Sequence, residues 1–575
     1  MSQLCVLSFD CSASPSLSIA RNIKLAEKSE IFYGWGVAWY PHSNGAAVVI
    51  KDSAKESEKR MTRAIQKWQE FQSTSFLCHI RGASKGLSQQ DMQPFRRTYA
   101  GRDWLLSHIG EIYDSDYLKT LTLGKNPVFE PVRKIDSEHI FCWLLSEINK
   151  KKARKLSQFG FGNMYTLLQK VNQLGNVNLV MLDGEDLIVY QDKNHFSPFY
   201  YTRIKPPYSK NVLKLGDAVL EVGDHLDAYR TLMIVSTERS NSYEWKKMDG
   251  AQMMVLRRGQ VIWDSSISGK KIKNQMVEPR KIERQSIEIL SIYHKTTYRY
   301  DSVVELSKHF LRLHPMHDEF QKVLANDITI SVEHKQESFK DVFGNKVTFI
   351  KPNAPFETLI IEMYSKVAIK DSFQESVGML NRRGNIPLVW MPWQRQMMSA
   401  YLLPPELPES QLLELYDFSM SFVERNDYDV MEVLLDLNKT IYKDFTYESG
   451  VTNVNTTPFE VYIKRKGVCQ DFANLFICIS RILSIPARYR TGYIYTGINH
   501  ENKMQSDASH AWVEVYFPWQ GWVGYDPTNG CLANQDYVRV ACGRNFYDAT
   551  PTSGTIYKGG EENETLDIEV KVSKE

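Results

Sequence analysis

The sequence is poor in cysteine, has no long apolar run and carries almost no net charge. Its cysteines stand at positions 5, 11, 78, 142, 469, 478, 531 and 542, and none forms a CxxC pair. This scatter argues against a zinc site or a dense disulfide framework, so we expect no metal or other cofactor and a reducing, cytoplasmic location. No apolar stretch approaches the roughly 18 residues of a membrane span. Residues 1–10 lack the basic and apolar regions of a signal peptide, and no membrane partner is expected.

The near balance of charge excludes a further class of partner. Lys and Arg total 70 against 68 Asp and Glu, a formal net charge of +2, so no nucleic acid is expected as a partner. The 43% hydrophobic and 24% charged residues are typical of a globular protein. A chain of 575 residues is too long for one hydrophobic core, and about two to four domains are expected.

One cysteine stands in a distinctive setting. Cys469 follows Gly467 and Val468 and precedes apolar residues that recur at helical spacing, namely Phe472, Leu475, Phe476, Ile479, Ile482 and Leu483. Cys469 is therefore expected at the start of a helix, where the helix dipole favours a thiolate. Cys478, farther along the same helix, is interpreted as a core residue.

A histidine and an aspartate follow this cysteine along the chain. His510 begins an alternating stretch that predicts a strand through Phe517, and Asp526 ends the next predicted strand. Such a hairpin can place the carboxylate against the imidazole. We predict that His510 takes the Cys469 proton and returns it to the leaving group, while Asp526 orients the imidazole. The backbone N–H of Cys469, with Gln470 or an upstream side chain, is the candidate oxyanion hole.

These residues belong to a set of motifs that closely resembles the bacterial transglutaminase-like superfamily, a papain-related group with an N-terminal β-sandwich. The resemblance covers about residues 286–575 and rests on Thr296-Thr297-Tyr298-Arg299-Tyr300-Asp301, Phe343-Gly344-Asn345, Gly467-Val468-Cys469-Gln470-Asp471-Phe472-Ala473, Ile485-Pro486-Ala487-Arg488-Tyr489, His510-Ala511-Trp512-Val513-Glu514-Val515, Asp526-Pro527-Thr528-Asn529 and Gly543-Arg544-Asn545-Phe546-Tyr547-Asp548. It implies that Cys469, His510 and Asp526 are the catalytic triad of an enzyme that works through a thioester. It leaves open whether the acyl group passes to water or to an amine.

The stretch before the catalytic region is rich in β-forming residues. Residues 269–285 are largely basic and polar and are interpreted as an exposed linker. From 286 to 370, short alternating runs without helical spacing predict a small β-sandwich. This segment contains no cluster of acid, base and nucleophile, which favours a structural or substrate-presenting role.

The first 268 residues contain a second set of motifs, in Leu4-Cys5-Val6-Leu7, Gly34-Trp35-Gly36-Val37-Ala38, His79-Ile80-Arg81, His108-Ile109-Gly110 and Asp136-Ser137-Glu138. They resemble the class II glutamine amidotransferase domain, which has the N-terminal-nucleophile (Ntn) fold. The resemblance implies that Arg81 grips a substrate carboxylate through its guanidinium group. It also implies that Asp136 holds the substrate α-amino group and that Gly110 belongs to the oxyanion motif. Cys5 occupies the position of the family's nucleophilic cysteine.

Two departures set this segment apart from that family. The family's cysteine is the first residue and its own α-amine is the base, whereas Met1 to Leu4 precede Cys5 here. The family's oxyanion asparagine is replaced by Ile109, and the loss of one such donor costs roughly 10²–10³ in rate. We therefore interpret Cys5 as a degenerate nucleophile, in a domain that binds or positions an amino-acid-like or γ-glutamyl group.

The sequence as a whole predicts an α+β multidomain protein: a four-layer αββα Ntn-like domain, a middle β-sandwich and a papain-like transglutaminase core over residues 371–575. The predicted function is that of a bacterial cysteine-dependent acyl-transfer enzyme, a peptidase or a transamidase, acting on a peptide or γ-glutamyl amide. Two alternatives remain open. Removal of Met1 to Leu4 would activate an N-terminal glutaminase, and a scaffold without catalysis would use both domains for binding alone.

Overall fold

The computed structural model describes residues 2–19, 32–41, 45–53, 71–83, 92–114, 116–133, 135–223, 228–267, 287–370, 384–496, 509–560 and 564–575. The chain divides into two compact units, Met1–Lys273 and Asn274–Glu575. The predicted linker, residues 269–285, lies outside the described residues.

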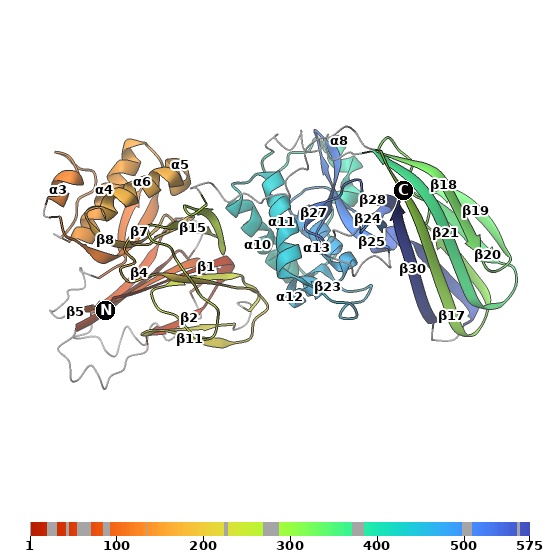
Figure 1. Cartoon of the computed structure of the whole chain (residues 1–575), viewed down its shortest axis with the longest axis horizontal. Coiled ribbons are helices and arrows are strands. Elements are labelled where there is room, and N and C mark those ends of the chain that lie inside the picture. Colours follow the sequence, from red (N-terminus) through yellow and green to blue (C-terminus); the bar gives the residue numbers. More distant parts are fainter. Residues whose placement is uncertain are drawn as a thin grey trace. The chain divides into compact units, whose positions relative to one another are not determined.

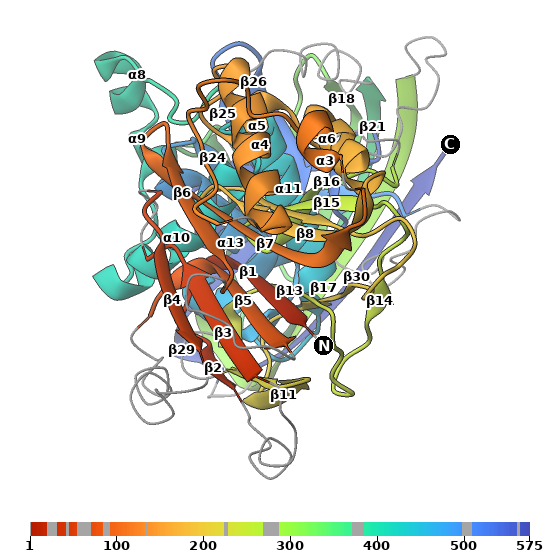
Figure 2. The same cartoon turned by 90° about the vertical axis from the view of Figure 1, so that its left-hand side faces the viewer.

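Two antiparallel sheets form the centre of the first unit. One sheet has the order β14 (Lys246–Lys247), β10 (Tyr200–Ile204), β13 (Leu232–Ser236), β1 (Gln3–Ala13), β5 (Ser73–Ala83), β3 (Phe32–Trp39) and β4 (Val48–Ser53). The other has the order β16 (Gln260–Asp264), β15 (Met253–Arg257), β9 (Leu187–Tyr190), β8 (Gly175–Leu182), β7 (Arg102–Ile112) and β6 (Phe95–Tyr99). Figure 2 shows β1, β3, β4 and β5 of the first sheet running side by side. Leu4 and Val6 of β1 share one buried core with Leu105 of β7 and Val180 of β8, so the two sheets pack face to face.

Each of these sheets has an outer layer. The helices α3 (Tyr117–Thr120), α4 (Asp136–Lys150), α5 (Leu156–Phe159) and α6 (Phe161–Asn172) lie against the six-stranded sheet, where Ile140 and Leu168 share a core with Leu106 and Leu179. The small sheet β11 (Asn211–Leu215), β12 (Ala218–Val222) and β2 (Ser16–Ile19) covers the seven-stranded sheet. In the part of the unit that the structure describes, the second outer layer is thus formed by strands.

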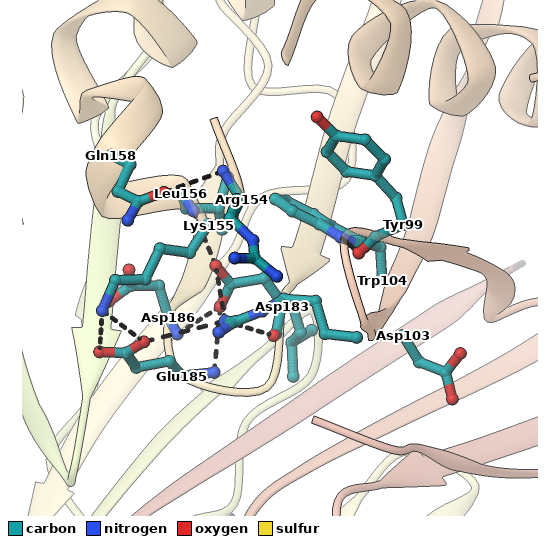
Figure 3. Close-up of polar contacts among 12 residues, drawn as sticks. Tyr99, Asp103, Trp104, Arg154, Lys155, Leu156, Gln158, Asp183, Glu185 and Asp186 are labelled. Carbon is teal, nitrogen blue, oxygen red and sulfur yellow. Dashed lines mark hydrogen bonds and ion pairs between the residues drawn. The ribbon is translucent and has the colours of Figure 1, made fainter. Parts of the chain in front are cut away.

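The start of α5 is fixed to the turn between β8 and β9 (Figure 3). The buried Asp183 accepts hydrogen bonds at Oδ2 from the Leu156 N–H (2.7 Å) and at Oδ1 from the Glu185 and Asp186 N–H groups (3.0 and 2.8 Å). Lys155 pairs with Glu185 at 3.0 Å. Because a helix start leaves N–H groups without partners, one buried carboxylate here fixes both the turn and the helix.

The long strand β17 (Ile287–Leu311) organises a sheet in the second unit. Its first part pairs with β21 (Phe356–Lys370) and β30 (Glu564–Lys574), and its last part with β20 (Lys346–Pro352) and β29 (Thr552–Gly559). The strands β18 (Gln321–Ile330) and β19 (His334–Lys340) complete the sheet at β21 and β20. The predicted β-rich segment is present, but two strands from the end of the chain join it. Alternation identifies a strand without naming its partner, so this return was not predicted.

The rest of the second unit packs helices against another sheet (Figure 1). The helices are α10 (Glu409–Arg425), α11 (Val430–Asp444), α12 (Pro458–Lys464) and α13 (Cys469–Ile482), with the short α8 (Pro392–Met397), α9 (Ser399–Leu402) and α14 (Phe546–Ala549). The sheet has the order β27 (Cys531–Leu532), β26 (Gly521–Asp526), β25 (His510–Phe517), β24 (Ala487–Ile494) and β28 (Tyr537–Gly543). A separate pair, β22 (Thr446–Tyr447) and β23 (Lys466–Gly467), is parallel. The predicted mixed α+β architecture is confirmed, and no helix in the described ranges is long and apolar enough to cross a membrane.

Candidate active site

Helix α13 begins at Cys469, as its sequence pattern predicts. The side chain of Asp471 accepts hydrogen bonds from the Val468 N–H (2.8 Å) and from the Thr452 hydroxyl (2.7 Å). A Cβ atom on Gly467 would lie 2.8 Å from the Asp471 side chain, so only glycine fits there without a shift. The segment before the cysteine is thus fastened to the first turn of its own helix, and Cys469 remains half-buried.

The predicted base and its orienting carboxylate meet on adjacent strands. His510 opens β25 and Asp526 closes β26. The His510 Nε2–H donates to Asp526 Oδ2 at 2.7 Å, and the side chains are only 1% and 0% exposed. Burial alone would lower the pKa of His510, but the negative charge of Asp526 and contact with the Cys469 thiol raise it to about 10. The imidazolium is therefore stabilised well above its ordinary range.

The Cys469 thiol lies in contact with His510 and is one of the groups that raise the pKa of the imidazole. Nε2 is occupied by Asp526, so the contact with Cys469 falls to Nδ1. Nδ1 is buried and forms no hydrogen bond of good geometry within the described ranges. Trp512 stacks on the imidazole with ring centroids 6.1 Å apart and planes inclined by 22°. The structure thus brings Cys469, His510 and Asp526 together in the order that thiol, base and orienting group require.

Asp526 is held by more donors than the sequence indicated. Its Oδ2 also accepts from the Tyr537 hydroxyl (2.7 Å) and the Asn529 amide (2.6 Å), and its Oδ1 accepts from the N–H groups of Thr528 (2.9 Å) and Asn529 (3.2 Å). Burial would raise the pKa of Asp526, but His510 and these hydrogen bonds hold it below its usual value. The turn after an Asp-Pro pair is a local signal that could have identified Asn529. Tyr537 carries no such signal, because only the folding of β28 beside β24 brings it near.

Helix α13 carries two further residues that the sequence singled out, Cys478 and Gln470. Cys478 is fully buried in the face of α13 that packs into the core, which confirms its interpretation as a core residue. Gln470 is half-buried in the first turn of α13. Its place in an oxyanion hole with the Cys469 N–H stays a prediction. Within the described ranges, no group of three or more His, Cys, Asp or Glu side chains could hold a metal ion.

In the first unit, three predicted residues gather around a buried histidine. Arg81 lies near the end of β5, and Asp136 is the first residue of α4. Burial lowers the pKa of His108, the charge of Asp136 opposes this shift, and the charge of Arg81 adds to it. The carboxylate of Asp136 accepts from the Ile112 N–H at 3.2 Å. A Cβ on Gly110 would lie 1.9 Å from a backbone oxygen and 2.7 Å from His108, so the close packing there requires glycine.

Cys5 lies apart from this group. β1 pairs with β5 so that Leu4 is opposite His79 and Cys5 is opposite Cys78. Leu4 faces the core between the two sheets, whereas Cys5 is 5% exposed in the core on the opposite face. Burial, with Cys78 beside it, raises the pKa of the Cys5 thiol far above its usual range, which disfavours the nucleophilic thiolate.

A different residue of the same strand shares the face of Arg81. Side chains alternate along a strand, so Ser2, half-buried just before β1, falls on the face of Leu4. The pairing of Gln3 with Ile80 places Ser2 beside the Arg81 end of β5. Ser2 was not among the predicted site residues, and the alternation of β1 is the signal that could have identified it.

Models of three known families match parts of the chain. The model of the transglutaminase-like superfamily matches residues 418–527, that of the bacterial transglutaminase-like N-terminal region matches 290–368, and that of class-II glutamine amidotransferases matches 1–280. An uncharacterized protein of Mycobacterium tuberculosis is 32% identical over 300 residues, which cover 49% of this chain and 91% of that protein. The chain belongs to the bacterial transglutaminase-like superfamily. It carries, in addition, a class II glutamine amidotransferase-like domain.

Two solved structures resemble parts of this transglutaminase-like protein. A "Putative Cysteine Protease" from Cytophaga hutchinsonii matches with 23% identity and a TM-score of 0.40, over 50% of this chain and 91% of its own. A predicted glutamine amidotransferase from Pseudomonas aeruginosa matches with 19% identity and a TM-score of 0.34, over 45% of this chain and 99% of its own.

Proposed function

We propose that the protein is a cysteine-dependent acyl-transfer enzyme that acts on a peptide or γ-glutamyl-type amide. The observation that carries the proposal is the buried 2.7 Å hydrogen bond between His510 and Asp526, with the other imidazole nitrogen at Cys469. In this arrangement one ring nitrogen exchanges a proton with the thiol. The other is held by a carboxylate that stabilises the imidazolium.

The reaction follows from these positions. The proton of the Cys469 thiol passes to Nδ1 of His510, where Asp526 stabilises the imidazolium, and the Sγ then attacks the amide carbonyl carbon. The C–N bond of the tetrahedral adduct then breaks, and His510 returns the proton to the leaving amine, which leaves a thioester on Cys469. Water or an amine attacks the thioester carbon and loses a proton to His510. The C–S bond breaks, the thiol regains its proton, and the acyl product departs as an acid or a new amide.

For the first unit we propose binding without hydrolysis. Arg81 offers a guanidinium to a carboxylate and Asp136 offers a carboxylate to an α-amino group, as the resemblance to glutamine amidotransferases implies. Two observations favour binding over glutaminase chemistry. Cys5 is buried away from Arg81, and the Ile109 side chain belongs to the core between the sheets, where it offers no oxyanion donor.

The test is turnover of a panel of peptide and γ-glutamyl amides, with and without an amine acceptor, by the full chain. Cys469→Ala is expected to abolish release of the leaving amine, because it removes the nucleophile. Cys478→Ala, on the same helix but in the core, is the matched control and should keep activity. Activity that persists in Cys469→Ala would refute the proposal. The product formed with and without the amine distinguishes hydrolysis from transamidation.

A further inference from the structure

The carboxylate of Asp526 is shared unevenly among its donors. Three donors converge on Oδ2, from His510, Tyr537 and Asn529, while two backbone N–H groups occupy Oδ1. A carboxylate oxygen has about two lone-pair directions. The three donors therefore compete for the lone pairs of Oδ2. Each hydrogen bond to this oxygen weakens the other two.

Tyr537 can only be a donor in this group. A carboxylate that carries its charge accepts hydrogen bonds and donates none. Burial, followed by the charge of Asp526, raises the pKa of Tyr537 well above its usual range, so the phenol keeps its proton. The phenol oxygen also lies 3.3 Å from Sγ of Cys531. Burial raises the pKa of Cys531 to about 12, so this thiol keeps its proton and can donate a hydrogen bond to the phenol oxygen of Tyr537.

The ring of Tyr537 makes a second, independent contact with the site. It meets the Trp512 ring edge-on, with centroids 5.3 Å apart and planes at 74°, and Trp512 stacks on His510. Tyr537 is 3% exposed. Phenylalanine at this position would keep the ring contact and remove only the hydroxyl.

We propose that Tyr537 is a positioning residue that acts through Asp526 and sets how tightly His510 holds its proton. The proposal deepens the proposed function and rests on it for its effect on turnover. The hydrogen bond from Tyr537 withdraws negative charge from Oδ2. The carboxylate therefore stabilises the imidazolium less than it would without that hydrogen bond. His510 can then return its proton to the leaving amine. Without the Tyr537 hydroxyl, the imidazolium of His510 would be a weaker acid than it is with the hydroxyl in place.

The charged and titratable groups near His510 come from each element packed against it. Asp526 on β26 and Cys469 on α13 contact His510 itself. Tyr537 on β28 and Cys531 on β27 lie near Asp526. Tyr489 on β24 and Asp471 on α13 lie near Cys469. In the part of the chain that the structure describes, the side chains that share Oδ2 with His510 are those of Tyr537 and Asn529. A change confined to the Tyr537 hydroxyl therefore reports on this shared oxygen.

The experiment measures the rate of Cys469 alkylation by iodoacetamide between pH 5 and 11, in the full chain, by peptide mass spectrometry. Loss of the His510 proton changes the charge beside Cys469, and with it the rate of alkylation, so it gives an inflection at high pH. Tyr537→Phe should move that inflection up by about 0.5 pH unit or more. With an amide substrate, Tyr537→Phe should also lower kcat about threefold, because a shift of about 0.5 pKa unit makes the imidazolium a weaker acid toward the leaving amine. An inflection that stays in place or moves down would overturn the proposal.

Two comparisons isolate the route of the effect. Tyr493→Phe removes another buried hydroxyl, which bonds His294 at 2.8 Å and not Asp526, and it should leave the inflection unchanged; an equal shift there refutes the proposal. In an Asp526→Asn background, Tyr537→Phe should add no further shift, because its route is gone. A full shift in that background would mean that Tyr537 acts by some other path.

The readout needs no substrate, so its failure is distinct from failure of the proposed function. A shifted inflection in a protein that turns over no amide supports the role of Tyr537 and refutes acyl transfer. If Tyr537→Phe does not fold, Cys531→Ala is the substitute, because it removes the thiol beside the phenol oxygen. It should shift the inflection in the same direction by a smaller amount, and no shift would overturn the proposal.

Discussion

At the scale of residues, the sequence allowed the three principal groups of the candidate site to be located. Cys469 was recognisable because a helical pattern starts there, and His510 and Asp526 because each marks one end of a predicted strand. Their proximity in the structure depends on the hairpin between β25 and β26. Tyr537 was not predicted, since nothing near it in the sequence signals a contact with Asp526. Local patterns identify groups within one element, while groups that tertiary packing adds remain undetected.

The pairing of His510 with Asp526 predicts how stability depends on pH. The pKa of His510 is about 10 in the folded chain, against 6.5 for an ordinary histidine. The protonated form therefore stabilises the fold fully below pH 6.5, and this contribution is lost as the pH rises to about 10. We expect the melting temperature to fall across this range, and to fall less in Asp526→Asn, as calorimetry at several pH values will show. Parallel curves for the two proteins would contradict this linkage.

At the scale of elements, the start of α13 was predicted, but the side chain that fixes it was not. The apolar spacing identified the helix, whereas the hydrogen bond from Thr452 to Asp471 joins α13 to a distant loop. The same limit applies to the seven-stranded sheet built on β17. Its strands could be predicted from alternation, but the pairing of β29 and β30 with β17 brings residues from the two ends of this unit together.

Asp471→Ala tests the anchoring of the nucleophile. It removes the acceptor of the Val468 N–H and of the Thr452 hydroxyl, and leaving such groups without partners costs about 1–3 kcal/mol. We expect that loss in urea unfolding, together with slower alkylation of Cys469. Glu460→Ala is the matched control, because Glu460 bonds the Thr457 N–H at the start of α12. It should lower stability without slowing alkylation, and equal effects of both variants on alkylation would contradict a specific role for Asp471.

At the scale of the whole molecule, one chain carries two kinds of domain. Among the described residues, the predicted reacting groups of the second unit lie together, whereas the predicted Cys5 of the first unit lies apart from Arg81. Both resemblances were visible in short motifs. The structure adds the reason for the difference, because the alternation of β1 turns Cys5 into the core while Leu4 faces the six-stranded sheet. Which alternate side chains of a strand face the core is decided by the packing of the whole strand. A short motif alone does not specify that face.

This difference predicts that binding and catalysis separate between the units. In isothermal titration calorimetry with L-glutamine and with γ-glutamyl amides, the full chain should bind at least one of them without releasing ammonia. Arg81→Ala should weaken binding at least tenfold, because a guanidinium–carboxylate pair is lost. Arg96→Ala, a solvent-exposed arginine, is the control and should bind normally. Cys469→Ala should bind normally yet fail in acyl transfer. Ammonia release from glutamine that survives Cys469→Ala would show instead that the first unit is a working glutaminase, and its nucleophile would then have to be sought on the Ser2 face of β1 rather than at the buried Cys5.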